Sequence, residues 1–393
     1  MPISTATIRR GPAPGLCRRT VIGTLFATVL QSHAATKPLK IGMLVPLSGP
    51  AGLFGSSCRN CSEIGAAEIN ARGGIVGRPV ELRYADAGVA PAEVVRAATA
   101  LRQEGVSAFV GMHDSAVRVA LTQQFKGQVA YVYTPTYEGG ECSRGTYVLG
   151  ETPSQQLRPV IPWMALQMGV RRWYLIGNDY NWPRGTNTAA KTYIAGSGGT
   201  VVGEEYAPFG VDDFEEALNR IRDSRADAVL ITLVGGASVR FNQAFAARKM
   251  ANKVIRLGTL LEENTLRAIG AASSMNLYAS SGYFATIRTP AAKLFAAEYA
   301  TRFGADGPQL NVLAQSCYEG LRLLEVMGNK AQGFNVERLE QIAQWQITEG
   351  PRGMTVLHGR HAIRDIYVGK AEGAVFNIVK TFEAVRALED CQM

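Results

Sequence analysis

His113, Asp114 and Ser115 are consecutive and carry the three side-chain types of a hydrolase triad. A working triad needs its nucleophile, base and orienting acid to meet in space, which neighbouring side chains cannot do. The G-x-S-x-G turn that exposes the serine of one large hydrolase class is also missing. We therefore interpret Ser115 as the start of a helix, where its hydroxyl either caps the helix or faces a ligand oxygen.

The cysteines and histidines form no recognised catalytic or metal-binding pattern. Cys58 and Cys61, in the run CRNC, have the spacing of a redox centre, but nothing around them resembles a thioredoxin unit. His358 and His361 lie too far from the cysteines for a known zinc spacing. The turn SGPAGLFG matches neither the phosphate-binding loop nor the dinucleotide-binding glycine pattern. We expect no catalytic residue, no metal and no cofactor.

Aromatic and hydroxyl side chains gather in two loops. The first loop holds Tyr133, Thr134, Thr136 and Tyr137, and the second holds Tyr180 and Trp182. Aromatic walls with a few hydroxyls suit a small, weakly charged solute that is buried in a cleft. For Tyr133 and Tyr137, packing inside their own lobe is an equally good interpretation.

The elements that must position these loops occur in two similar halves. Apolar runs predict strands at 39–47, 79–86 and 107–111, and again at 171–177, 200–206 and 226–234. In each half a helix follows the first strand and ends at a glycine pair, Gly73-Gly74 or Gly198-Gly199. The pattern predicts an α/β protein with two doubly wound, Rossmann-like lobes around a ligand cleft.

Ligands of such sheets bind at the carboxyl ends of the strands. Six loops follow strands in this way: SGPAGLFGSS, GMHDSAV, YTPTYEGG, GNDYNWPRG, VGGAS and GTLLEEN. We expect these loops to converge on one cleft between the lobes. The lobes are expected to be discontinuous, with residues 36–150 and 285–350 in the first and residues 151–284 and 351–393 in the second. The connections between them are expected at GETPSQQ, GYFATIRTP and TEGPRGM.

Residues 1–35 have the pattern of an export signal. Four arginines precede the short apolar run VIGTLFATVL, and small residues follow it, which predicts cleavage near Ala34. Arg18-Arg19 also suggests the twin-arginine route. A wrongly assigned start codon, and hence a cytoplasmic protein, is the alternative. Cleavage would remove four of the 41 basic residues and no acid, so the formal net charge would fall from +8 to +4.

The rest of the chain indicates neither nucleic-acid binding nor a membrane span. Its charges are interspersed, and no later apolar run reaches spanning length. Five cysteines follow the expected signal, so in an oxidising compartment at least one thiol stays unpaired. We expect a structural disulfide that involves Cys58 or Cys61, either within this pair or with Cys142. We also expect Cys142 to fix the corner of the loop around TPTYEGGECSRG.

Several stretches resemble the type 1 periplasmic binding fold of ABC-transporter solute-binding proteins. KIGMLVPLSGPAGLFG and AAEINARGGIVGRPVEL are similar to the superfamily. Together with PTYEGGECSRGTYVLGETPSQQ, GNDYNWPRGTN and SGYFATIRTPAAKLF, they resemble the branch that binds branched-chain amino acids, urea and short amides. YEGGECS and GNDYNWPRG are similar more narrowly to the amide/urea-binding and nitrile-hydratase-associated members. The resemblance runs from about Lys40 to about Val379. It implies a periplasmic receptor without enzymatic activity, which closes on a small-molecule ligand and partners a membrane ABC permease.

The resemblance also implies ligand contacts at specific positions. Ser115 matches a hydroxyl that holds the ligand's carboxylate or carbonyl, and Glu262 falls near an acidic position that amino-acid binders use for the ammonium group. His113-Asp114 departs from the small residues usual before that serine, which favours an amide or urea. The full set of candidate ligand contacts is Phe54, His113, Ser115, Tyr133, Thr134, Thr136, Tyr180, Trp182 and Glu262.

The leading hypothesis is therefore a solute-binding protein for a short amide, urea, or a branched-chain or hydrophobic amino acid. The alternative is an amide-sensing regulator that acts through a partner protein rather than a permease; the cellular location separates the two. An enzyme that uses CRNC or His113 is a third hypothesis, which the motifs do not support.

Overall fold

The computed structural model describes residues 7, 11, 37–304, 307–388 and 391. The expected export signal and its cleavage site therefore lie outside the described residues, apart from two isolated positions. Among the described helices, none is both long and apolar enough to cross a membrane.

The first lobe contains a parallel sheet in the order β2-β1-β3-β4-β5. Its strands are β1 (Leu39–Val45), β2 (Val80–Asp86), β3 (Val106–Gly111), β4 (Ala130–Tyr133) and β5 (Thr146–Val148). Its helices include η1 (Gly52–Phe54), α1 (Gly55–Ala71), α2 (Pro91–Gln103) and α3 (Ser115–Phe125). Nearly every residue of β1 is buried, as its apolar run predicts for a strand that is covered on both faces.

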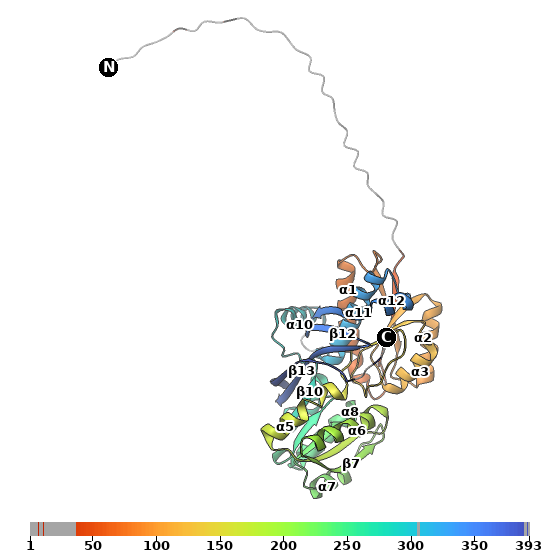
Figure 1. The fold of residues 1–393 in the computed structure, drawn as a ribbon. Coiled ribbons are helices and arrows are strands. Elements are labelled where there is room, and N and C mark those ends of the chain that lie inside the picture. The colour runs from red at the N-terminus through yellow and green to blue at the C-terminus, as the bar shows by residue number, and fades with distance from the viewer. Residues whose placement is uncertain (1–6, 8–10, 12–36, 305–306, 389–390, 392–393) are drawn as a thin grey trace, which may run out of the picture. The chain divides into compact units, whose positions relative to one another are not determined.

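The second lobe repeats this arrangement in the order β10-β9-β8-β6-β7. Figure 1 colours this part of the chain from yellow to green. Its strands are β6 (Arg172–Asn178), β7 (Thr200–Ala207), β8 (Ala228–Thr232), β9 (Ile255–Gly258) and β10 (Leu277–Ser281). Its helices are α6 (Asn181–Gly196), α7 (Glu215–Asp223), α8 (Gly235–Ala247), η2 (Met250–Asn252), α9 (Glu263–Ile269) and η3 (Ala271–Ser273). The two doubly wound α/β lobes predicted from the sequence are thus confirmed.

Glycines end the first long helix of each half. Gly73 and Gly74 follow α1 at φ of 98° and 80°, and Gly198 follows α6 at φ of 71°. These left-handed conformations are strained for most side chains, which explains why glycine pairs end both helices. Helix α7 begins at Glu215, where the Asp213 carboxylate accepts the Glu215 N–H at 2.8 Å and forms a turn before the helix.

The C-terminal part of the chain joins the two sheets. It contains α10 (Pro290–Phe303), α11 (Val312–Ala331), α12 (Val336–Ile342), β11 (Gln346–Gly350), β12 (Gly353–His358), β13 (His361–Glu372) and β14 (Val375–Val385). β13 pairs with β5 at its first residue and with β10 further along, so one strand belongs to both sheets. The chain therefore changes sheet inside β13. Residues 348–354, expected to form a connection, instead form the paired ends of β11 and β12 and the turn between them.

The connecting segments meet at a buried cluster of charges. After β5 the chain crosses through α4 (Pro153–Gln156) and α5 (Val160–Met168). Glu151 lies at this crossing and accepts from Arg352 at 2.8 Å; Glu319 lies 3.0 Å from Arg352, and Arg364 lies within 3.5 Å of both acids. All four side chains are almost wholly buried, and the two positive charges balance the two negative ones, as burial requires.

Candidate ligand-binding site

A cavity of about 230 Å³ lies where the carboxyl ends of the strands in the two lobes face each other. Each of the six loops expected to converge contributes at least one residue to its wall. The volume lies just below the range of roughly 300–1,000 Å³ that is usual for small-molecule sites. The cavity therefore fits a small solute.

The loop after β3 brings His113, Asp114 and Ser115 to the cavity wall. Asp114 caps α3, because its carboxylate accepts the Val117 N–H at 2.9 Å, and it stays solvent-exposed. The His113 ring lies 3.1 Å from the Asp114 carbonyl through Nδ1 and 2.8 Å from the Tyr131 hydroxyl through Nε2. Since a carbonyl only accepts, Nδ1 carries the proton and Nε2 accepts from Tyr131. Burial lowers the pKa of His113 to about 4, so the ring is neutral.

The loop after β4 contributes Tyr133 and Thr136 to the wall. The Tyr133 hydroxyl donates to the His113 carbonyl at 2.8 Å, and its ring stays buried. The Thr136 hydroxyl lies 2.9 Å from the Glu151 carbonyl and 2.8 Å from the Gln156 side chain. Thr134 is buried beside the Gly111 carbonyl and does not line the cavity.

Aromatic side chains form the wall on the second lobe. Tyr180, Trp182 and Phe209 line it, and the Tyr180 ring lies 5.0 Å from the Phe209 ring and 6.2 Å from the Trp182 ring. Trp182 is 2% exposed, and its Nε1 has no hydrogen-bond partner among the described residues. A buried N–H without a partner is unfavourable, so this donor is available to a ligand acceptor.

Phe54 lies on the first-lobe wall, but Glu262 does not line the cavity. Glu262 is the N-cap of α9, and its carboxylate accepts the N–H groups of Asn264 and Thr265 at 2.9 and 2.6 Å and the Thr265 hydroxyl at 2.7 Å. Leu260, two residues earlier, occupies the wall instead. The sequence could not show which residue of this loop faces the cavity, because Glu262 and Glu263 both suit the start of a helix.

The lobes touch each other closely at two places. A Cβ built on Gly235 of α8 would lie 2.3 Å from the Pro50 carbonyl oxygen, and one on Gly185 of α6 would lie 2.7 Å from the Glu138 Cβ. Pro50 and Glu138 belong to first-lobe loops, whereas α6 and α8 belong to the second lobe. Since only glycine fits at both contacts, the lobes are in a closed arrangement.

The expected disulfide from Cys58 or Cys61 is wrong. Cys142 pairs with Cys391, 249 residues away, and Cys58, Cys61 and Cys317 are buried free thiols. The physical reason is position: Cys58 and Cys61 lie in the buried face of α1, which packs against α11, whereas the C-terminal segment brings Cys391 to Cys142. Cys142 does tie the corner of its loop, as expected.

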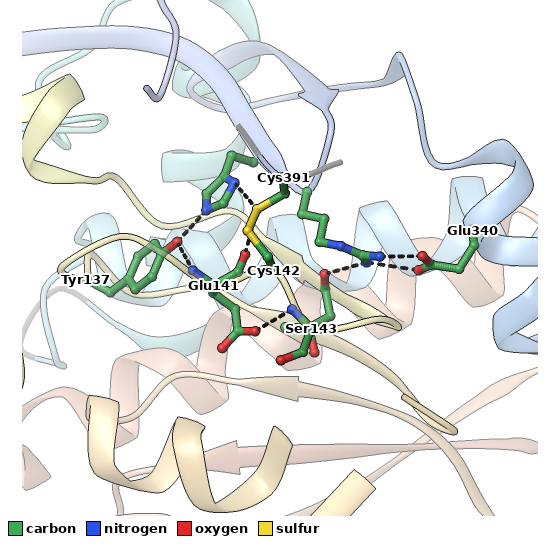
Figure 2. The surroundings of a disulfide bond; sticks show 9 residues. Tyr137, Glu141, Cys142, Ser143, Glu340 and Cys391 are labelled. Carbon is green, nitrogen blue, oxygen red and sulfur yellow. Dashed lines mark hydrogen bonds and ion pairs between the residues drawn. A yellow bond between two sulfur atoms is a disulfide. The ribbon is translucent and has the colours of Figure 1, made fainter. Parts of the chain in front are cut away.

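Figure 2 shows the Cys142–Cys391 disulfide, with Tyr137 on one side of it and Glu340 on the other. The Tyr137 hydroxyl hydrogen-bonds Nε2 of His361, the first residue of β13, and burial lowers the pKa of His361 to about 4. The disulfide therefore fastens the C-terminal segment beside the loop that carries Tyr133 and Thr136.

The sequence interpretation missed Asp114, Phe209 and Leu260 as wall residues and Glu138 as a partner of Ser115. Asp114 was considered as part of a triad pattern and as a departure from the small residues of the family, but not as an N-cap, although a polar residue between a strand and a helix is a usual N-cap position. No cluster of His, Cys, Asp or Glu suited to a metal ion occurs among the described residues.

The chain matches the family model of periplasmic binding proteins over residues 38–374. It is 26% identical over 374 residues to the Leu/Ile/Val-binding protein homolog 6 of Brucella melitensis biotype 1, covering 91% of this chain and 94% of the relative. It is also 26% identical over 215 residues to the Leu/Ile/Val-binding protein BraC3 of Rhizobium johnstonii, covering 54% of this chain and 59% of that relative.

Solved structures share its fold. A solute-binding protein of an ABC transporter from Rhodopseudomonas palustris HaA2, in complex with p-hydroxybenzoic acid, has a TM-score of 0.80 at 23% identity and covers 89% of this chain and 98% of its own. The substrate-binding protein LivJ of Streptococcus pneumoniae, in complex with isoleucine, has a TM-score of 0.76 at 21% identity. The match covers 88% of this chain and 99% of LivJ. The chain therefore belongs to the periplasmic binding protein family, as a type 1 solute-binding protein of an ABC transporter.

Proposed function

We propose that the protein is exported to the periplasm and delivers a small, uncharged, amide-type solute to a membrane ABC permease. The observation that carries this proposal is the charge of the cavity wall. Among the described residues, no lysine or arginine lines the cavity, and one carboxylate, that of Asp114, does. An anionic ligand buried there would have no cation to balance its charge, whereas a neutral ligand needs none.

The polar groups of the wall match the two ends of an amide. The Trp182 N–H is free to donate to a carbonyl oxygen, and the oxygens of Ser115 and Asp114 can accept from an NH₂ group. Phe54, Leu260 and Leu313 supply apolar surface for the rest of the solute. An amino-acid ligand has less support, because Glu262 is engaged in capping α9 rather than facing an ammonium group.

An aromatic carboxylic acid is a second candidate. The aromatic wall of Tyr180, Trp182 and Phe209 suits a flat ring, and the relative from Rhodopseudomonas palustris HaA2 binds p-hydroxybenzoic acid. In this chain, however, the carboxylate would meet the wall without a neighbouring cation.

A thermal-shift and calorimetric screen of the purified protein tests the proposal. The probes are urea, isobutyramide, benzamide, isobutyrate, benzoate, 4-hydroxybenzoate, leucine and isoleucine. We expect the amides to stabilise the fold, by about 2.7 kcal/mol at 100 times the dissociation constant. Tighter binding of 4-hydroxybenzoate or isoleucine than of any amide would refute the amide assignment.

A further inference from the structure

The loop YEGGECS places a second polar layer behind the cavity wall. The Ser115 hydroxyl donates to Oε2 of Glu138 at 2.5 Å, and Nη2 of Arg118 donates to Oε1 of the same carboxylate at 2.9 Å. Glu141 lies 3.5 Å from Nε of Arg118. The Arg118 guanidinium also lies over the rings of Tyr133 and Tyr137, at 5.4 and 4.7 Å. Ser115 and Arg118 are 1% and 5% exposed, so this arrangement is fixed inside the protein.

This layer sets the hydrogen-bond direction of Ser115. A hydroxyl has one hydrogen, and a carboxylate can only accept, so the Ser115 hydrogen belongs to Glu138. What Ser115 presents to the cavity is then its oxygen lone pairs. A ligand N–H can donate to them, whereas a ligand carboxylate oxygen would meet another acceptor. Arg118 holds Glu138 in place and keeps it paired.

We propose that Glu138 is a specificity-determining positioning residue, which turns the Ser115 hydroxyl away from the ligand and so selects an amide over the carboxylate of the same shape. The inference rests on the proposed amide function. Glu138 itself does not line the cavity; it acts through Ser115.

Replacement Glu138→Gln tests this by changing one atom. Arg118 is a donor and keeps the remaining oxygen, so the new NH₂ group faces Ser115. The Ser115 oxygen then accepts from Gln, and its hydrogen is free to reach the ligand. Dissociation constants are measured for isobutyramide against isobutyrate and for benzamide against benzoate. We expect the preference for the amide to fall by at least about tenfold in the variant, the ordinary size of a hydrogen bond with a charged partner.

Two controls separate this effect from a general loss of negative charge. Glu141→Gln removes a neighbouring carboxylate that pairs with Arg118 but does not touch Ser115, and it should keep the wild-type preference. In a Ser115→Ala background, Glu138→Gln should no longer change the preference, because no hydroxyl remains to be turned.

The outcomes distinguish failure of the proposed function from failure of the role of Glu138. A wild type that prefers the carboxylates refutes the proposed function. If the wild type prefers the amides and Glu138→Gln keeps that preference, the role of Glu138 is overturned and the proposed function stands. The same holds if Glu138→Gln changes the preference equally in the wild-type and Ser115→Ala backgrounds. Failure of all four probes to bind counts against both.

Discussion

Adjacent residues of one type have different roles in this structure. Glu262 is buried as a helix cap with several donors around its carboxylate. Glu263 is also buried, but its Oε1 accepts only the Ala285 N–H, at 2.7 Å, and its Oε2 has no partner among the described residues. Burial raises the pKa of Glu263 to about 8, so this side chain is protonated at neutral pH.

Because the pKa of Glu263 is raised in the folded state, the protein takes up a proton when it folds at neutral pH. Between about pH 4.5 and about pH 8 the folded state holds this proton and the unfolded chain does not, so stability falls as pH rises. The slope from this residue is at most about 1.4 kcal/mol per pH unit. Glu263→Gln stays neutral and should flatten the decline. Guanidinium chloride unfolding at pH 6 and pH 8.5 measures this decline, and parallel slopes for wild type and variant would contradict the expectation.

Trp182 offers the ligand a single N–H. Trp182→Phe keeps an aromatic face and removes this donor, so affinity for the amide ligand should fall by roughly 3–10-fold. Trp163→Phe, in α5 and away from the cavity, should leave affinity unchanged. Calorimetric titration of the two variants decides: equal affinities would mean that the indole N–H does not bind the ligand.

At the scale of elements, the closed cleft depends on how near α6 and α8 come to the first-lobe loops. The close contacts are made by glycines, because any side chain there would overlap the opposite lobe. One of these glycines, Gly185, lies within α6, where glycine is otherwise unfavourable by about 1 kcal/mol relative to alanine. The close approach of the lobes therefore explains why glycine occupies position 185, although it destabilises the helix.

Gly185→Ala should strengthen α6 and hinder closure at once. Its Cβ would overlap the Glu138 Cβ, so ligand affinity should fall by roughly tenfold while the unliganded protein unfolds no earlier. Gly196→Ala, at the end of the same helix, meets open space and should not affect binding. Calorimetric titration and thermal unfolding compare the two variants. Unchanged ligand affinity in Gly185→Ala would show that the lobes do not close as described.

At the scale of the whole molecule, the C-terminal part of the chain holds the lobes together. β13 belongs to both sheets, and Cys391 is fastened to Cys142 near the start of that strand. Links between residues far apart in sequence restrict the unfolded chain most in the chain-entropy model. We therefore expect the disulfide to stabilise the whole fold rather than one loop.

Replacing both Cys142 and Cys391 with serine should lower the free energy of unfolding by about 3–5 kcal/mol. Dithiothreitol should destabilise the wild type to a similar extent and have no further effect on the double variant. Denaturant titrations with and without the reductant measure this. A reductant effect that persists in the double variant would contradict the assignment of the disulfide.

The sequence predicted the fold well, because apolar runs and glycine pairs mark buried strands and helix ends locally. The sequence also predicted that six loops meet at one cleft, because ligands of parallel sheets bind at the carboxyl ends of the strands. The polar layer behind the cavity escaped prediction, since Ser115 and Glu138 lie in separate loops and only packing brings them together. The partner of Cys142 escaped as well, because nothing local distinguishes Cys391 from the buried thiols of α1.

Those buried thiols have a practical consequence for labelling. Cys58, Cys61 and Cys317 are fully buried, and burial raises the pKa of Cys58 and Cys61 well above the usual thiol range, so they resist maleimides while the protein is folded. A cysteine introduced at Phe209, which is 41% exposed at the cavity, would be the accessible thiol within the described chain. An environment-sensitive dye attached there would report ligand capture as a change in fluorescence, without reduction of the native disulfide.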